Sequence, residues 1–181
     1  MKKFTYIVTL STLVFFVGGC GTKVVQQKQQ DELLYAPSWV KQSKYEQGKI
    51  VKKGVSATNG TDFRIKRDEA LADAKIKISA LLEKRLKKLF SRIDPDSKYT
   101  SITDNSTEKI LKNSLELVKM EKLFETPQSA TVYLQATLSI NALEESVESY
   151  FIQNLQKYNY LFKNFTVLKN SGDLHVILTS E

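Results

Sequence analysis

Residues 131–140 read Thr-Val-Tyr-Leu-Gln-Ala-Thr-Leu-Ser-Ile, and they carry the most regular pattern in the chain. Val132, Leu134, Ala136, Leu138 and Ile140 alternate with Thr131, Tyr133, Gln135, Thr137 and Ser139. Because successive side chains of a strand point to opposite faces, this period of two predicts a strand with one well-buried face. Thr126-Pro127-Gln128 has the composition of a turn and joins the strand to residues 116–125, which predicts a β-hairpin.

Residues 62–90 have the periodicity of a long amphipathic helix, which Thr61 or Asp62 can cap. Apolar side chains recur every three or four positions, at Ala70, Leu71, Ala74, Ile78, Leu81, Leu82, Leu86 and Leu89. The small side chains of Ala70 and Ala74 are expected to let this helix approach a sheet closely. Most residues of the opposite face are basic, as is typical of a solvated surface.

The remaining segments complete the predicted element order. We expect a strand at 49–57, a polar loop from Asp94 to Asn105, a short helix at 106–115, a helix capped by Asn141 and Glu144, and a terminal hairpin of 165–168 with 174–179. This order favours an α+β fold, a small, mostly antiparallel sheet with a long helix and a C-terminal helix packed on one face.

The first 19 residues have the layout of an export signal. Lys2 and Lys3 precede an apolar stretch of about 14 residues, which is shorter than the ~20 that span a bilayer. Gly18-Gly19 then supplies small residues before Cys20, the only cysteine in the chain. We therefore expect removal of residues 1–19, a flexible Gln- and Lys-rich tether over 20–35, and a single domain over 36–181.

The end of this signal, Val17-Gly18-Gly19-Cys20, resembles the bacterial lipobox. The resemblance implies cleavage before Cys20, a diacylglyceryl group on its sulfur, and acylation of the new amine, as with palmitate. Gly21 replaces the Asp that retains such proteins in the inner membrane, so the resemblance implies the outer membrane. The alternative is an ordinary export signal followed by an unmodified cysteine.

Further motifs of the mature chain resemble the LPP20 lipoprotein family of Helicobacter, Campylobacter and their relatives. These motifs are Pro37-x-Trp39-Val40, Gly54-Val55, the long helix with Arg67, Ala70 and Ala74, and Val132-Tyr133-Leu134. The resemblance implies a small α+β domain, without enzymatic activity, that faces the periplasm or the cell surface. It implies a surface antigen or a flagellum-associated protein, held to the membrane by acyl chains. Our own hypothesis for its function is a structural or adaptor domain that has another copy or an envelope protein as partner.

Catalytic and metal-binding patterns do not stand out. His175 is the only histidine and lies on a predicted strand, and Cys20 is expected to be a thioether, so we predict no catalytic residues, no metal site and no cofactor. The net charge of +7 favours anionic surfaces, and Lys84, Arg85, Lys87 and Lys88 are the candidates for such a contact. An alternative function is therefore a surface binder of lipid, polysaccharide or nucleic acid through the basic helix 62–90, with nucleic acid the least expected of the three.

Overall fold

The computed structural model describes residues 32–42, 46–57 and 62–180, and it has the expected α+β class. Three strands, β1 (Lys49–Val55), β2 (Lys119–Glu125) and β3 (Val132–Ser139), form an antiparallel sheet in the order β1-β3-β2. The central strand is therefore the one whose alternation is clearest in the sequence. The predicted hairpin of β2 and β3 is confirmed, with a bulge between Met120 and Lys122.

The two faces of β3 are covered by different parts of the chain. Val132, Leu134, Ala136 and Leu138 belong to the main core, which also contains the inner face of the long helix. Tyr133 points to the other face and packs against Ala36 and Val40, which precede the sheet in sequence. The central strand is therefore buried on both sides over most of its length.

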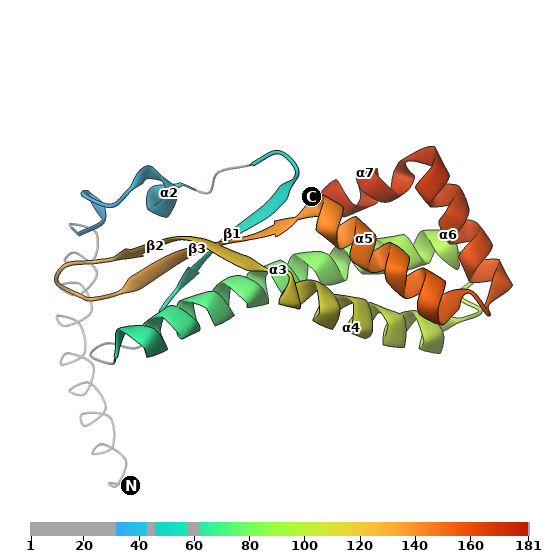
Figure 1. Cartoon of the computed structure of the whole chain (residues 1–181), viewed down its shortest axis with the longest axis horizontal. Coiled ribbons are helices and arrows are strands. Elements are labelled where there is room, and N and C mark those ends of the chain that lie inside the picture. Colours follow the sequence, from blue (N-terminus) through green and yellow to red (C-terminus); the bar gives the residue numbers. More distant parts are fainter. Residues whose placement is uncertain (1–31, 43–45, 58–61, 181) are drawn as a thin grey trace, which may run out of the picture.

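The long helix α3 (Phe63–Ile93) connects the two halves of the molecule, as Figure 1 shows. Its N-terminal half packs on β1 and β3, and its C-terminal half packs on other helices. The close approach expected at Ala70 and Ala74 is confirmed: a Cβ on Gly54 of β1 would lie only 1.7 Å from the Ala70 carbonyl oxygen. A glycine is thus required where the sheet and the helix backbone meet.

The prediction of a polar loop from Asp94 to Asn105 is wrong from residue 100 onward, because helix α4 (Thr100–Glu116) begins there. Its buried face consists largely of hydroxyl side chains, so it lacks the apolar stripe from which a helix is recognised. Thr107 donates to the carbonyl oxygen of Thr103, and Ser106 and Ser114 donate to the carbonyl oxygens four residues earlier. These bonds satisfy the hydroxyl groups inside the helix and allow their burial.

The C-terminal region is helical, so the predicted terminal hairpin is wrong. Helix α5 (Ile140–Tyr150) continues into a π-helix (Phe151–Leu155), and α6 (Asn159–Ser171) and α7 (Asp173–Thr179) follow. Gly172 has a φ of 82° and ends α6 in a left-handed conformation, whereas the sequence suggests a hairpin turn at this point. The short apolar runs on either side fit a helix face as well as a strand.

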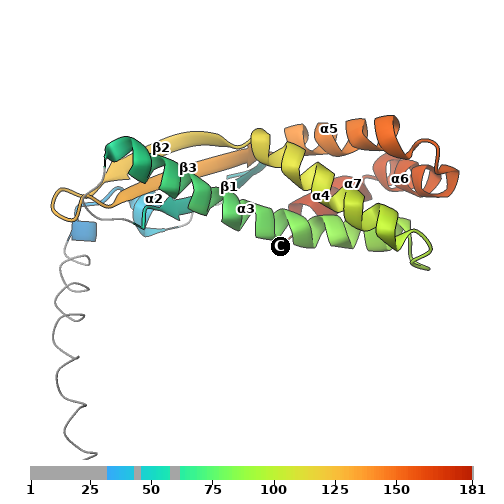
Figure 2. The same cartoon turned by 90° about the horizontal axis from the view of Figure 1, so that it is seen from below.

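The start of α5 also differs from its prediction. Ser139, rather than Asn141, is the N-cap, and its hydroxyl accepts from the Ala142 N–H. The helix thus begins directly after β3, and Figure 1 shows α5 extending from the sheet half into the helical half of the molecule. Figure 2 shows the resulting elongated shape, with the β2–β3 turn at one end and the start of α6 at the other.

Candidate functional site

The predicted lipid-attachment residue, Cys20, lies outside the described residues, so the site is built from the chain that follows it. The first described residue is Glu32, whose carboxylate is buried against the β2–β3 turn. It accepts from the Ser129 N–H at 2.8 Å and from the Ser129 Oγ at 2.7 Å. The hydrogen bond from the Ser129 hydroxyl is the main cause that lowers the pKa of Glu32, and it outweighs the opposing effect of burial.

Residues 32–42, which we call the N-terminal strap, lie across the outer face of the sheet. The strap contains the short helix α2 (Ser38–Lys41), and its buried Ala36 and Val40 pack on Tyr133. Trp39 is half-buried against the same cluster. Two hydrogen bonds add to the packing, because Lys41 donates to the Leu34 carbonyl and Lys53 donates to the Val40 carbonyl.

The strap corrects one boundary of the predicted organisation. The sequence assigns residues 20–35 to a flexible tether because they are polar and lack an apolar period. The structure holds Glu32 and Leu33 against the sheet, so these two residues belong to the packed domain rather than to a tether. The burial of Glu32 is not apparent from sequence because it depends on its partner Ser129, 97 residues further along the chain.

The four basic candidates of α3 do not form one exposed surface. Arg85 is buried and donates through Nε to the Ser180 carbonyl at 2.9 Å and through a terminal nitrogen to the Thr179 carbonyl at 3.2 Å. It therefore fixes the C-terminal segment. A signal for this role exists in the sequence, since Arg85 follows Leu82 by three positions and lies within the apolar stripe.

The three neighbouring lysines are exposed but have different surroundings. Lys87 forms an ion pair with Glu83 at 2.6 Å, and the hydrogen bond that it donates to that carboxylate raises the pKa of Lys87. Lys88 donates to the Ser180 hydroxyl at 3.2 Å. Lys84 is exposed on the solvent side of the helix. Only these three lysines are exposed for the predicted contact with an anionic surface. Arg85, the one residue of the four that could bind a phosphate group in bidentate fashion, is buried.

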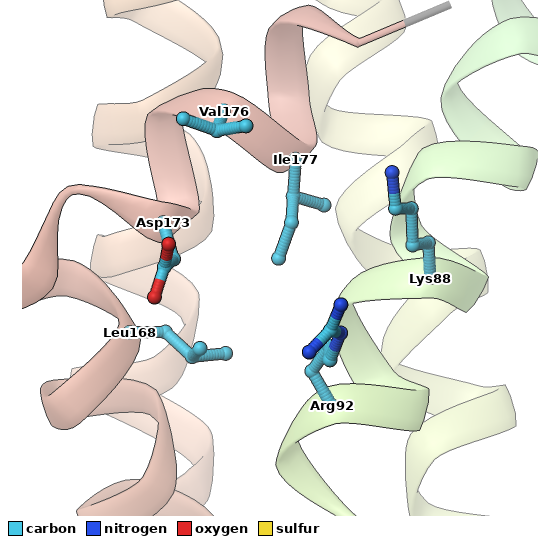
Figure 3. A pocket seen from close by; sticks show the side chains of 6 residues that line it. All are labelled: Lys88, Arg92, Leu168, Asp173, Val176 and Ile177. Carbon is cyan, nitrogen blue, oxygen red and sulfur yellow. The ribbon is translucent and has the colours of Figure 1, made fainter.

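A small pocket lies beside this region, between α3, α6 and α7 (Figure 3). It has a volume of about 130 Å³ and is lined by Lys88, Arg92, Leu168, Asp173, Val176 and Ile177. Its walls carry both signs of charge, with the Arg92 guanidinium group opposite the Asp173 carboxylate. The volume is well below the ~300–1,000 Å³ of ordinary ligand sites. Neither Arg92 nor Asp173 stands out in the sequence, where residues 174–179 resemble a strand.

His175 lies on α7 rather than on the predicted strand. Its Nδ1 is 2.5 Å from Oε1 of Glu144 on α5, and its side chain is exposed. The pair ties α7 to α5 at the surface. Over residues 32–42, 46–57 and 62–180, no group of three or more His, Cys, Asp or Glu side chains is placed to hold a metal ion.

Comparisons with protein-family models and with curated proteins give no information on this site. The chain matches no protein-family model and no curated protein. Within the part of the chain that the structure describes, none of the helices has the length and apolar character needed to cross a membrane.

Proposed function

We propose that the protein is a lipid-anchored, non-enzymatic module of the bacterial cell envelope, attached to the outer membrane through Cys20. One observation carries the proposal. A lipobox-like sequence ends at Cys20, and an ordered domain that begins by Glu32 follows it within about a dozen residues. Such a segment spans at most roughly 40 Å when extended, which holds the domain close to the bilayer.

The physical chemistry of acyl chains makes this attachment stable. Each buried CH₂ group contributes about 0.8 kcal/mol, so one chain binds reversibly whereas two or three chains anchor a protein firmly. The thioether and the acylated amine of a lipobox protein together provide that number of chains. The domain itself then needs no membrane-spanning segment.

The domain is proposed to act as a structural or adaptor unit, in line with the resemblance to the LPP20 family. That resemblance points to self-association or to an envelope protein as partner, in a surface antigen or a flagellum-associated assembly. The internal role of Arg85 supports this proposal over ligand binding by α3. Arg85 holds the C-terminal segment, which leaves three exposed lysines of the candidate contact.

Fractionation of cells that produce the full chain tests the proposal. The wild-type protein should sediment with membranes and be released by detergent but not by high salt, whereas Cys20→Ser should be found in the soluble fraction. In a Gram-negative host, Gly21→Asp should move the protein from the outer to the inner membrane. If wild-type protein and Cys20→Ser fractionate identically, the lipid anchor is refuted.

Chemical crosslinking of intact cells then tests the adaptor role. The wild-type protein should give a discrete crosslinked species with a second copy or with one envelope protein. A protein that remains monomeric at its native expression level, with no crosslinked envelope protein, would contradict this role while leaving the anchor intact.

A further inference from the structure

Large apolar side chains are exposed where the chain enters the domain. Leu34 and Tyr35 of the N-terminal strap are 68% and 89% exposed, and Phe63 and Ile65 at the start of α3 are 42% and 52% exposed. The strap packs on the sheet through other side chains, such as the buried Ala36, and leaves Leu34 and Tyr35 exposed. Grouped exposed apolar residues often mark a surface that contacts another body.

The fold brings these two segments to the same end of the molecule, although about thirty residues separate them in sequence. Both are fixed to the turn between β2 and β3. Glu32 accepts from Ser129 at one side of this turn, and Lys66 donates to the carbonyl oxygen of Ala130 at 2.9 Å on the other. Figures 1 and 2 show the turn at one extremity of the long axis, with the strap and the start of α3 flanking it.

We propose that this end of the domain, which we call the entry end, lies against the head groups of the lipid bilayer, with Leu34, Tyr35, Phe63 and Ile65 inserted at its surface. The inference rests on the proposed lipid anchor and adds an interaction surface to it. The segment that leads from Cys20 reaches the domain at this end, so a lipidated chain keeps Glu32, the first described residue of the entry end, within roughly 40 Å of the bilayer. Tyrosine is well suited to the depth of the head groups, because its ring is apolar and its hydroxyl group stays hydrated.

The charges around the entry end indicate which force holds it there. Arg64 pairs with Asp62, Arg67 with Asp68, and Lys66 with Glu125, at 3.2, 2.8 and 3.7 Å. These three basic side chains are therefore matched by acidic neighbours, whereas Lys41 of the strap donates to the backbone carbonyl of Leu34, so the entry end offers little net charge to anionic lipids. Contact with the membrane is expected to come from the apolar side chains and to be insensitive to salt.

This orientation leaves the opposite end of the molecule free. The π-helix and the start of α6 lie at the far end of the long axis and would face away from the bilayer (Figure 1). An envelope partner would then meet the helical half of the domain, while the sheet half stays against lipid.

Site-directed spin labels on the full lipidated chain test the inference directly. Cys20 is the only cysteine, so a lipidated wild-type protein takes up no label, and each introduced cysteine is labelled alone. We would label Tyr35→Cys and Phe63→Cys at the entry end. Ile76→Cys on α3 and Val167→Cys on α6 serve as controls, because the native side chains are 68% and 59% exposed but lie outside the entry end.

The labelled proteins are reconstituted into vesicles of phosphatidylethanolamine and phosphatidylglycerol. Collisions of each label are measured with oxygen, which concentrates in lipid, and with a water-soluble nickel chelate. Labels at 35 and 63 should collide often with oxygen and rarely with nickel, at low and at high ionic strength. Labels at the two control positions should show the reverse.

Two results would overturn the inference. Free access of nickel to all four labels would show that the domain stands away from the bilayer. Protection of positions 35 and 63 from both reagents would show that protein, such as a second copy, covers the entry end. Labelling of the wild-type protein would instead reveal a free Cys20 thiol and refute the lipid anchor, so the two failures are distinguishable.

Discussion

Replacement of Gly54 by alanine should destabilise the domain strongly, because the added methyl group has no space between β1 and α3. The new Cβ would lie 1.7 Å from the Ala70 carbonyl oxygen and 2.8 Å from the Ala74 nitrogen, whereas ordinary contacts begin at 3.4 Å. Both of these atoms belong to the helix backbone, so a change of rotamer cannot relieve the overlap. The helix must instead move away from the strand.

The size of the effect follows from the core that this movement would open. Ala70, Ala74 and Ile78 are completely buried at the interface and would lose contact with the sheet. Overpacking of a core costs about 1–3 kcal/mol and more where the backbone cannot yield, so we expect a loss of about 3 kcal/mol or more. For a domain of this size, that loss lowers the Tm by roughly 6–12 °C.

Urea unfolding of the mature chain carrying Cys20→Ser measures this loss, with far-UV circular dichroism and Trp39 fluorescence as probes. Gly48→Ala is the matched control, since no atom lies within 4 Å of its added Cβ and only the φ of +74° opposes the change. It should cost about 1 kcal/mol. If Gly54→Ala is no more destabilising than Gly48→Ala, the proposed close packing of β1 on α3 is wrong.

Two further substitutions test how the chain ends are held. Glu32→Gln should cost about 1.5–3 kcal/mol by weakening the hydrogen bonds to Ser129, and hydrogen exchange should rise in the strap. Because the folded state lowers the pKa of Glu32, its contribution is complete above its ordinary value of 4.5 and is lost as the pH falls below it. This role would be contradicted if hydrogen exchange in the strap were the same in Glu32→Gln and in the wild type. It would also be contradicted if the stability of both proteins fell equally at acid pH. Arg85→Ala should release α7 and increase hydrogen exchange over residues 173–180, whereas Lys84→Ala, on the exposed face, should change stability by less than about 0.5 kcal/mol. Equal effects of the two substitutions would refute the structural role of Arg85.

The parts of the fold that are predictable from sequence are those in which hydropathy follows a simple period. Apolar and polar side chains alternate strictly along β3, although both of its faces are buried, and α3 repeats its apolar side chains over many turns. Helix α4 is hidden because Ser106 and Thr107 occupy its buried face, where their hydroxyl groups bond to the helix backbone. No hydropathy pattern records burial of that kind.

The candidate site is less predictable because its important residues act through distant partners. A run of basic residues suggests one charged surface, yet the helical spacing turns Arg85 inward toward Ser180, 95 residues away in sequence. Likewise, residues 32–35 read as part of a polar tether until Ser129 is brought beside Glu32. The two halves of the apolar entry end are likewise placed by long-range contacts, from Ser129 to Glu32 and from Lys66 to Ala130. Neither half is therefore conspicuous in the sequence.

Mass spectrometry of the mature protein purified from membranes would detect the lipid anchor itself. The N-terminal peptide should begin at Cys20, with a diacylglyceryl thioether on its sulfur and an acyl chain on its amine. A free thiol on Cys20, or residues 1–19 still attached, would refute the anchor.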